Sequence, residues 1–296
     1  MTTFFKTAIA SACLILAAGS AQAAPYAFSS LTFDTFNLSG LTAPGVTVNS
    51  ATVQTSDSAS YLNTGDAASA GPAAPATTAN PLAPLTAGSD VRQVTAGPGP
   101  FPTENTFTQA LLTAFGARGD ALLAGSLVGG NASAGVVAEG NLGQFGTASS
   151  AAGTTTGFSV NVGVNSTTTF VLSFFATDSL MATTTASGQG ASSQVNASFT
   201  VTGTGATAPF SFVYSPDNLN LAVSSTDGQS NTAGTARTSY STNVTLQPGT
   251  YQFSLLSGAQ ERLNANAQVP EPAPLALLGL GLVGFGLSRL RKNKNA

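Results

Sequence analysis

The sequence predicts an all-β extracellular domain of the β-sandwich or jelly-roll type. Three observations predict it: apolar and polar residues alternate with a period of two, turn residues separate the alternating runs, and charge is scarce. Charged residues make up 7% of the 296 residues, against about a quarter in a typical soluble domain. Because 42% of the residues are hydrophobic, the chain can build a core and does not have the composition of a disordered tract.

The alternation defines most of the expected strands. Apolar residues, mainly Phe, Val and Leu, occupy one face of these segments, and Ser, Thr, Asn or Gly occupy most positions of the other. The alternating segments are 158–164, 195–201, 210–214 and 219–223, and segments 26–38 and 46–55 are also expected to be strands. Segment 167–176 differs because it is apolar on both faces, and we expect it to be a central buried strand.

A Pro-Gly turn lies between two further alternating runs. Val244 and Leu246 precede Gln247-Pro248-Gly249, and the alternating residues Tyr251, Phe253 and Leu255 follow it. Pro followed by Gly suits a type II turn, so the pattern predicts a β-hairpin. Residues 261–267 are expected to form a last strand.

Two regions interrupt the strand pattern. Residues 57–102 are rich in Ala, Pro, Gly, Ser and Thr, which predicts a long, poorly ordered insertion or edge loop. The apolar residues that follow are Phe107, Leu111, Leu112 and Phe115. Their spacing indicates a short amphipathic helix that ends at Gly116 or Gly119, and a pair of irregular strands fits the same residues.

The N-terminus has the features of a secretory signal peptide over residues 1–23. Lys6 supplies the positive charge, an apolar run follows, and Ala21-Gln22-Ala23 forms a cleavage site. Cleavage by signal peptidase after Ala23 would leave Ala24 as the first residue of the exported chain.

The C-terminus combines a short apolar span with a basic end. Ala273–Leu287 contains 15 uncharged residues, which as a helix would extend about 22 Å, short of a hydrocarbon core of about 30 Å. Ser288 and a snorkelling Arg289 bring the span close to the minimum for a single membrane helix. The basic residues after it are Arg289, Arg291, Lys292 and Lys294, and they predict a cytoplasmic C-terminus with the preceding domain outside.

Pro270-Glu271-Pro272, the apolar span and the basic end occur in an order that resembles the PEP-CTERM sorting signal. The resemblance covers about the last 27 residues. It implies recognition of the Pro-Glu-Pro triplet by an exosortase, a membrane-embedded transpeptidase-like protease of Gram-negative bacteria that typically make exopolysaccharide. It also implies transient insertion in the inner membrane, cleavage near the triplet and release to the outer surface. The expected organisation is a signal peptide (1–23), a β-sandwich domain (24–268) and a sorting signal (269–296).

Catalytic chemistry has few candidates in this sequence. The chain lacks His and Trp, its one cysteine, Cys13, lies in the signal peptide, and Lys occurs only near the two ends. These absences exclude Ser-His-Asp, Cys-His and Ser-Lys catalytic sets in the exported chain. A pair of carboxylates for glycoside hydrolysis remains open, because eleven Asp and Glu lie between Pro25 and Gln268.

The sequence predicts no catalytic residue, no metal and no cofactor. The turns Asp217–Asn220 and Asp227–Asn231 offer oxygen ligands for calcium, but Asp and Asn favour turns for local reasons. Four Arg against eleven acids in the exported region argue against nucleic acid as a partner. We expect a structural or adhesive matrix protein whose partners are exopolysaccharide or other copies of itself. The alternatives are a secreted carbohydrate-binding module and, less favoured, a cryptic hydrolase.

Overall fold

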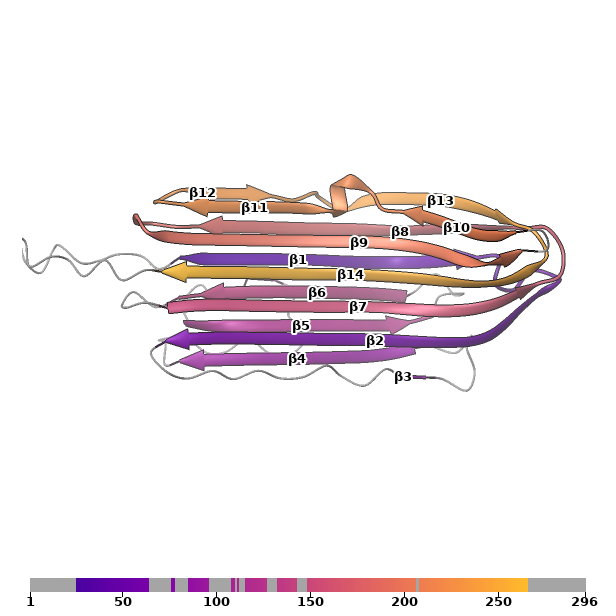
Figure 1. Ribbon diagram of the computed structural model, residues 1–296, viewed down its shortest axis with the longest axis horizontal. Coiled ribbons are helices and arrows are strands. Elements are labelled where there is room, and N and C mark those ends of the chain that lie inside the picture. The colour runs from indigo at the N-terminus through magenta and orange to yellow at the C-terminus, as the bar shows by residue number, and fades with distance from the viewer. Residues whose placement is uncertain are drawn as a thin grey trace, which may run out of the picture.

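The computed structural model describes residues 25–63, 76–77, 85–95, 108–109, 111, 115–126, 132–142, 148–205 and 208–265. These residues form β-strands and one 3₁₀ turn, η1 (Asp217–Leu219), and the described part of the chain contains no α-helix. The strands lie in two antiparallel sheets stacked face to face, and the strands of both layers run along the long axis of the molecule (Figure 1). The all-β prediction and its two-layer form agree with this architecture.

Each sheet contains seven strands within the described residues. In sheet A the order is β12-β8-β1-β6-β5-β4, and β13 also pairs with β8. Its strands are β1 (Tyr26–Ser39), β4 (Leu85–Thr95), β5 (Phe115–Gly125), β6 (Ala132–Asn141), β8 (Thr168–Thr183), β12 (Ser230–Ala233) and β13 (Thr238–Leu246).

In sheet B the order is β10-β9-β14-β7-β2-β3, and β11 also pairs with β9. Its strands are β2 (Val46–Asn63), β3 (Ala76–Thr77), β7 (Ala148–Val164), β9 (Gln189–Gly205), β10 (Pro209–Tyr214), β11 (Leu221–Thr226) and β14 (Gly249–Ala265). The long strands β2, β7, β14 and β9 lie next to one another, so the centre of this sheet is a broad and regular surface.

Aromatic side chains fill one half of the space between the sheets. A bulge in β1 between Phe33 and Phe36, with Thr35 at φ 48°, resets the alternation so that both phenylalanines face inward. Phe174 of β8 contacts both rings, at centroid distances of 5.4 and 5.7 Å. Phe158 of β7 packs edge-on against Phe36 at 5.1 Å, which joins sheet B to this cluster. Such rings contribute packing beyond the area they bury, and they anchor the two layers here.

Small and polar residues fill the other half. A Cβ added to Gly119 of β5 would lie 2.5 Å from Cγ2 of Thr154 in β7. A Cβ added to Gly140 of β6 would lie 2.6 Å both from Oε2 of Glu261 and from Oγ of Ser150. The two sheets therefore approach closely here, and glycine is the residue that leaves room for side chains of the opposite layer.

A buried ion pair lies on the other, outward side of sheet A. Nε of Arg118 donates to Oε2 of Glu139 at 2.7 Å, and both side chains are at most 1% exposed. Oε1 of Glu139 accepts from the Tyr26 hydroxyl at 2.6 Å and from the Leu111 amide at 2.8 Å. Nη2 of Arg118 donates to the carbonyl of Thr108 at 2.6 Å. The pair thereby fixes the backbone of Thr108 and of Leu111 against the sheet.

The expected hairpin around Pro248 is wrong, although the alternation on each side of it is right. β13 belongs to sheet A, where it pairs with β8, whereas β14 belongs to sheet B, where it pairs with β7 and β9. Gln247 and Pro248 therefore connect the two layers. Residues 261–265 are the continuation of β14 and not a separate strand.

The helix expected from Phe107 to Gly116 or Gly119 is also wrong for the described part of that range. Thr108, Gln109 and Leu111 are not helical, and Phe115 begins β5, as in the alternative with strands. The irregular insertion expected at 57–102 is wrong for three parts of that range. Residues 57–63 complete β2, Ala76–Thr77 form β3 beside it, and β4 pairs with β5 through eleven consecutive residue pairs.

Strand β8 is not buried on both faces as expected. Phe170, Leu172 and Phe174 are buried, but Val171 between them is 36% exposed and Phe175 is half-buried. The central positions of sheet A belong to β1 and β6 instead. The signal peptide and the span at 273–287 lie outside the described residues, among which no helix has the length and apolar character needed to cross a membrane.

The buried ion pair gives a prediction about stability. Arg118→Met leaves the Glu139 carboxylate buried without its cation and should lower the unfolding free energy by about 3–5 kcal/mol. Chemical denaturation measured by circular dichroism would test this. The matched control is Arg237→Met, because Arg237 pairs with Asp34 at 2.7 Å with both side chains about half exposed. A loss from Arg118→Met no larger than that of the control would contradict the structural role.

Candidate functional site

The described strands of sheet B carry a single charged side chain on their outer face. Among all the residues of its seven strands, only Asp57, Glu261 and Arg262 are charged. Asp57 and Glu261 point into the sandwich and are 2% and 1% exposed. Arg262 points outward and is exposed. The remaining outward positions of the described strands are mainly Ser, Thr, Asn, Gln and Gly, so the face offers neutral hydrogen-bonding groups around one cation.

The strand register arranges these groups in two neighbouring rows that cross five strands, in the order β2, β7, β14, β9 and β11. The first row is Ser60, Ala151, Arg262, Ser192 and Ser224. The second row is Ser58, Gly153, Gln260, Gln194 and Ala222. The long polar side chains stand near the middle of each row, and small side chains flank them.

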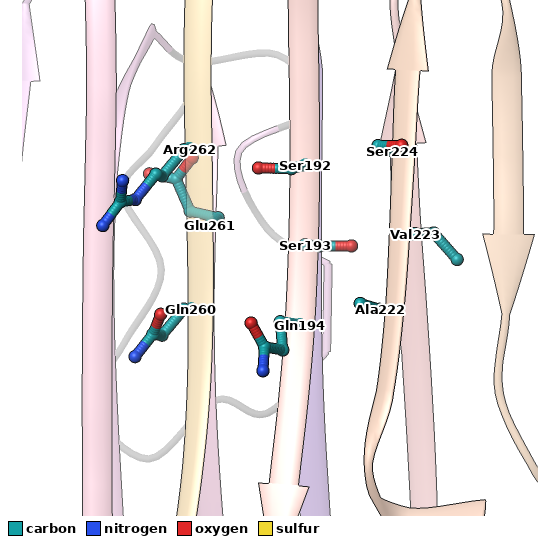
Figure 2. A pocket seen from close by; sticks show the side chains of 9 residues that line it. All are labelled: Ser192, Ser193, Gln194, Ala222, Val223, Ser224, Gln260, Glu261 and Arg262. Carbon is teal, nitrogen blue, oxygen red and sulfur yellow. The ribbon is translucent and has the colours of Figure 1, made fainter.

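Two shallow hollows follow from this alternation of long and small side chains. One has a volume of about 380 Å³ and lies between β14, β9 and β11. The other has a volume of about 250 Å³ and lies between β2, β7 and β14. Both are lined by Gln260 and Arg262, so they flank β14 as two parts of one surface. Figure 2 shows Arg262, Gln260 and Gln194 extending on the same side of their strands.

The Arg262 guanidinium has no ion-pair partner within the described part of the chain. Its neighbours in the row, Ala151 and Ser192, are too short to cover it. The amide side chains of Gln260 and Gln194 lie opposite each other one row away, and both are exposed. The arrangement can hydrogen-bond an extended polar ligand, and it offers a bidentate donor for an anionic group.

Glu261 lies directly beneath this face. The Ser150 hydroxyl donates to its Oε1 at 2.7 Å, and no hydrogen-bond partner for Oε2 is present among the described residues. Burial raises the pKa of this carboxyl to about 8, and the nearby Glu139 charge also raises it, while the Ser150 hydrogen bond opposes the shift. At neutral pH the folded protein therefore holds Glu261 in its neutral form.

In the two turns with potential calcium ligands, Asp217–Asn220 and Asp227–Asn231, polar side chains make hydrogen bonds to the backbone. The Asn220 side chain donates to the carbonyls of Ala197 and Pro216, at 3.1 and 2.8 Å, and so ties η1 to β9. Oδ1 of Asp227 accepts from the Gly188 amide at 3.0 Å. Within the described residues no group of three or more His, Cys, Asp or Glu side chains could hold a metal ion.

Every residue of the predicted processing signals lies outside the described residues. They are Ala21, Ala23 and Ala24 at the signal-peptidase site, Pro270, Glu271 and Pro272 in the sorting motif, and Arg289, Arg291, Lys292 and Lys294 in the basic tail. The outer-face site, by contrast, was missed from the sequence. The sequence contained a pattern that could have revealed this site. Tyr251, Phe253 and Leu255 alternate with outward residues, and continuing this alternation along the strand places Arg262 on the outer face.

Fold and surface together define an all-β sandwich protein with an open, nearly uncharged polar face. Its sorting class comes from the C-terminal segment: residues 268–292 match the family model described as the PEP-CTERM protein-sorting motif. The predicted resemblance is confirmed: the chain carries a PEP-CTERM sorting motif, which implies export and an exosortase as its processing partner. The match covers the sorting segment and not the sandwich, and comparison with curated proteins gave no match.

The buried carboxyl gives a prediction about pH. The folded state keeps the Glu261 proton up to about pH 8, whereas the unfolded chain releases it near its ordinary pKa of 4.5. The folded state thus binds more protons between these values. The stabilisation is complete below about pH 4.5 and is lost as the pH rises through about 8, with a slope that approaches about 1.4 kcal/mol per pH unit.

Glu261→Gln should remove this contribution. Its unfolding free energy, measured by denaturation between pH 4 and pH 9, should fall less steeply with pH than that of the wild type. Asp217→Asn, which removes an exposed acid, is the control and should follow the wild type. Identical pH profiles for Glu261→Gln and the wild type would rule out the buried neutral carboxyl.

Proposed function

We propose that this chain is a surface or extracellular-matrix protein with a structural, adhesive role in exopolysaccharide, biofilm or floc. The observation that carries the proposal is the outer face of sheet B, where hydroxyl and amide side chains surround one cation and two hollows. The sorting motif supports it, because such a motif implies export, and polysaccharide and other copies of the chain are available outside the cell.

The route to that location belongs to the same proposal. Signal peptidase removes residues 1–23, and the span at 273–287 holds the chain in the inner membrane with its basic tail in the cytoplasm. An exosortase then cuts near Pro270-Glu271-Pro272 and discards the tail. Two prolines one residue apart predict an extended backbone at Val269 and Glu271, which is the form that a protease binds.

The proposed role is not enzymatic. Two of the acids that a glycosidase would need exposed, Glu139 and Glu261, are at most 1% exposed in this fold. Glu139 is engaged by Arg118 and Tyr26, and Glu261 is engaged by Ser150. A secreted carbohydrate-binding module is the second candidate, and the hollows beside Gln260 favour it.

Processing gives the first test. Glu271→Ala removes the charge of the triplet, so the exosortase should fail to act and the chain should accumulate uncut in the inner membrane. Intact-mass analysis and immunoblotting of the membrane and extracellular fractions would measure this. The control is Asp217→Asn, which changes an exposed acid and should be processed normally. Glu261→Ala would not serve as a control, because that side chain is buried. Release of the Glu271→Ala protein at wild-type mass would mean that the triplet is only a linker.

Binding gives the second test. The extracellular form of the protein should be retained on the host's purified exopolysaccharide without releasing reducing sugar, and deletion of the gene should weaken cell aggregates. Co-sedimentation, a reducing-sugar assay and aggregate dispersal under shear measure the three effects. Weakened aggregates without polysaccharide retention would favour adhesion between copies of the chain. Retention with intact aggregates would favour the carbohydrate-binding module, and release of sugar would contradict a non-enzymatic role.

A further inference from the structure

Arg262 is a cation without an anion in an otherwise neutral surface. Every other charged side chain of sheet B is buried, and within the described residues no carboxylate pairs with the guanidinium. The other two arginines whose side chains the structure describes behave differently. Arg118 is buried against Glu139, and Arg237 binds Asp34 through two hydrogen bonds at 2.9 and 2.7 Å. Among the arginines whose side chains the structure describes, Arg262 is therefore the one open to an external anion.

The surface around Arg262 fits a long polar ligand better than a small ion. The two rows cross five strands, which at about 4.8 Å per strand spacing gives a track roughly 19 Å long. The rows are two residues apart, so the track is roughly 7 Å wide. Hollows of about 380 and 250 Å³ lie on the two sides of β14 along this track. An extended chain that crosses the strands would occupy both hollows and pass over Gln260 and Arg262.

The chemistry of the track points to a carbohydrate that carries carboxylates. Gln260 and Gln194 each offer both donors and acceptors, as sugar hydroxyls require, and the serines at the ends of the rows offer more. The guanidinium matches a carboxylate in a bidentate geometry. A nucleic acid or an anionic membrane would require several cations, and this described face has one.

We propose that the two rows form a binding site for an extended acidic polysaccharide, in which Arg262 pairs with a uronate carboxylate and Gln260 and Gln194 hydrogen-bond neighbouring sugar hydroxyls. The inference rests on the proposed matrix function and specifies the ligand of this face. It makes Arg262 the residue that distinguishes acidic from neutral polymers, while the neutral side chains provide the general affinity for polysaccharide.

The test compares one polymer in two charge states. The extracellular form of the protein is run by affinity electrophoresis in gels that contain polygalacturonate or its fully methyl-esterified form. We expect the wild type to bind polygalacturonate about tenfold more tightly than the ester, as the loss of one charged hydrogen-bonded pair implies. Arg262→Gln should bind the acid about tenfold more weakly and the ester as the wild type does.

Two further variants make the result specific. Arg237→Gln removes the same charge from a site that already has an anion, and it should bind polygalacturonate as the wild type does. Ala151→Glu places a carboxylate beside Arg262 in the first row and should reproduce the loss seen for Arg262→Gln. Thermal unfolding of each variant checks that the sandwich is intact.

The outcomes separate this site from the general function. Equal binding of polygalacturonate by the wild type and Arg262→Gln, or equal binding of acid and ester by the wild type, would overturn the acidic-ligand site. If the host exopolysaccharide still retained the protein, the proposed function would stand without it. If no polysaccharide retained the protein, both the acidic-ligand site and the proposed role in exopolysaccharide would fail. A change in sedimentation caused by Arg262→Gln, without a change in polymer binding, would assign the face to contacts between copies of the chain.

Discussion

The structure depends on the register of β14. This strand pairs with β7 on one side and β9 on the other over the whole of Gly249–Ala265. Its period-two alternation therefore decides, for seventeen consecutive residues, which side chains enter the core and which face outward. A slip by one residue would expose Phe253 and bury Arg262, and either change is costly. The aromatic half of the core thus also fixes the position of the candidate site at the other end of the strand.

The same register places a carboxyl inside the sandwich next to a guanidinium outside it. Glu261 and Arg262 are adjacent in the sequence but lie on opposite faces of the sheet, so they do not neutralise each other by direct contact. Glu261 avoids the cost of a buried charge by remaining protonated near neutral pH, with a hydroxyl of Ser150 against it. Gly140 in the opposite sheet provides the necessary space. Arg262 consequently keeps its charge available to a partner outside the molecule.

Local patterns in the sequence predicted the strands well and their pairing poorly. The alternations at 158–164 and 195–201 lie in β7 and β9, because a strand is the regular structure that places every second side chain on the same face. The Pro-Gly turn after Leu246 was misleading, because turn residues suit a connection between layers as well as a hairpin. Strand β4 was hidden by its composition, since its eleven pairs with β5 are backbone interactions that need no apolar run.

The candidate site was predictable in principle but lacked a recognisable motif. Continuing the alternation from Tyr251 places residue 262 outside and residue 261 inside, but a buried glutamate contradicts the usual expectation for that residue type. The Arg118–Glu139 pair could not be predicted from the sequence. Its two residues lie in separate strands, and no local spacing of residues indicates that they are in contact. The sorting signal, in contrast, is linear, and its residues could be found without any structure.

A neutral hydrogen-bonding face has consequences for how tightly it can bind. Each neutral hydrogen bond adds only about 0.5–1.5 kcal/mol after exchange with water, so a short neutral sugar would be held weakly. A polymer that crosses all five strands makes many such contacts at once, and neighbouring copies of the protein on one polymer chain add to its retention. Specificity then depends on the few groups that cannot be replaced by water, and on this described face Arg262 is the charged one. A protein that presents this face to a polymer would in this way bind weakly to single sugars and firmly to a continuous matrix.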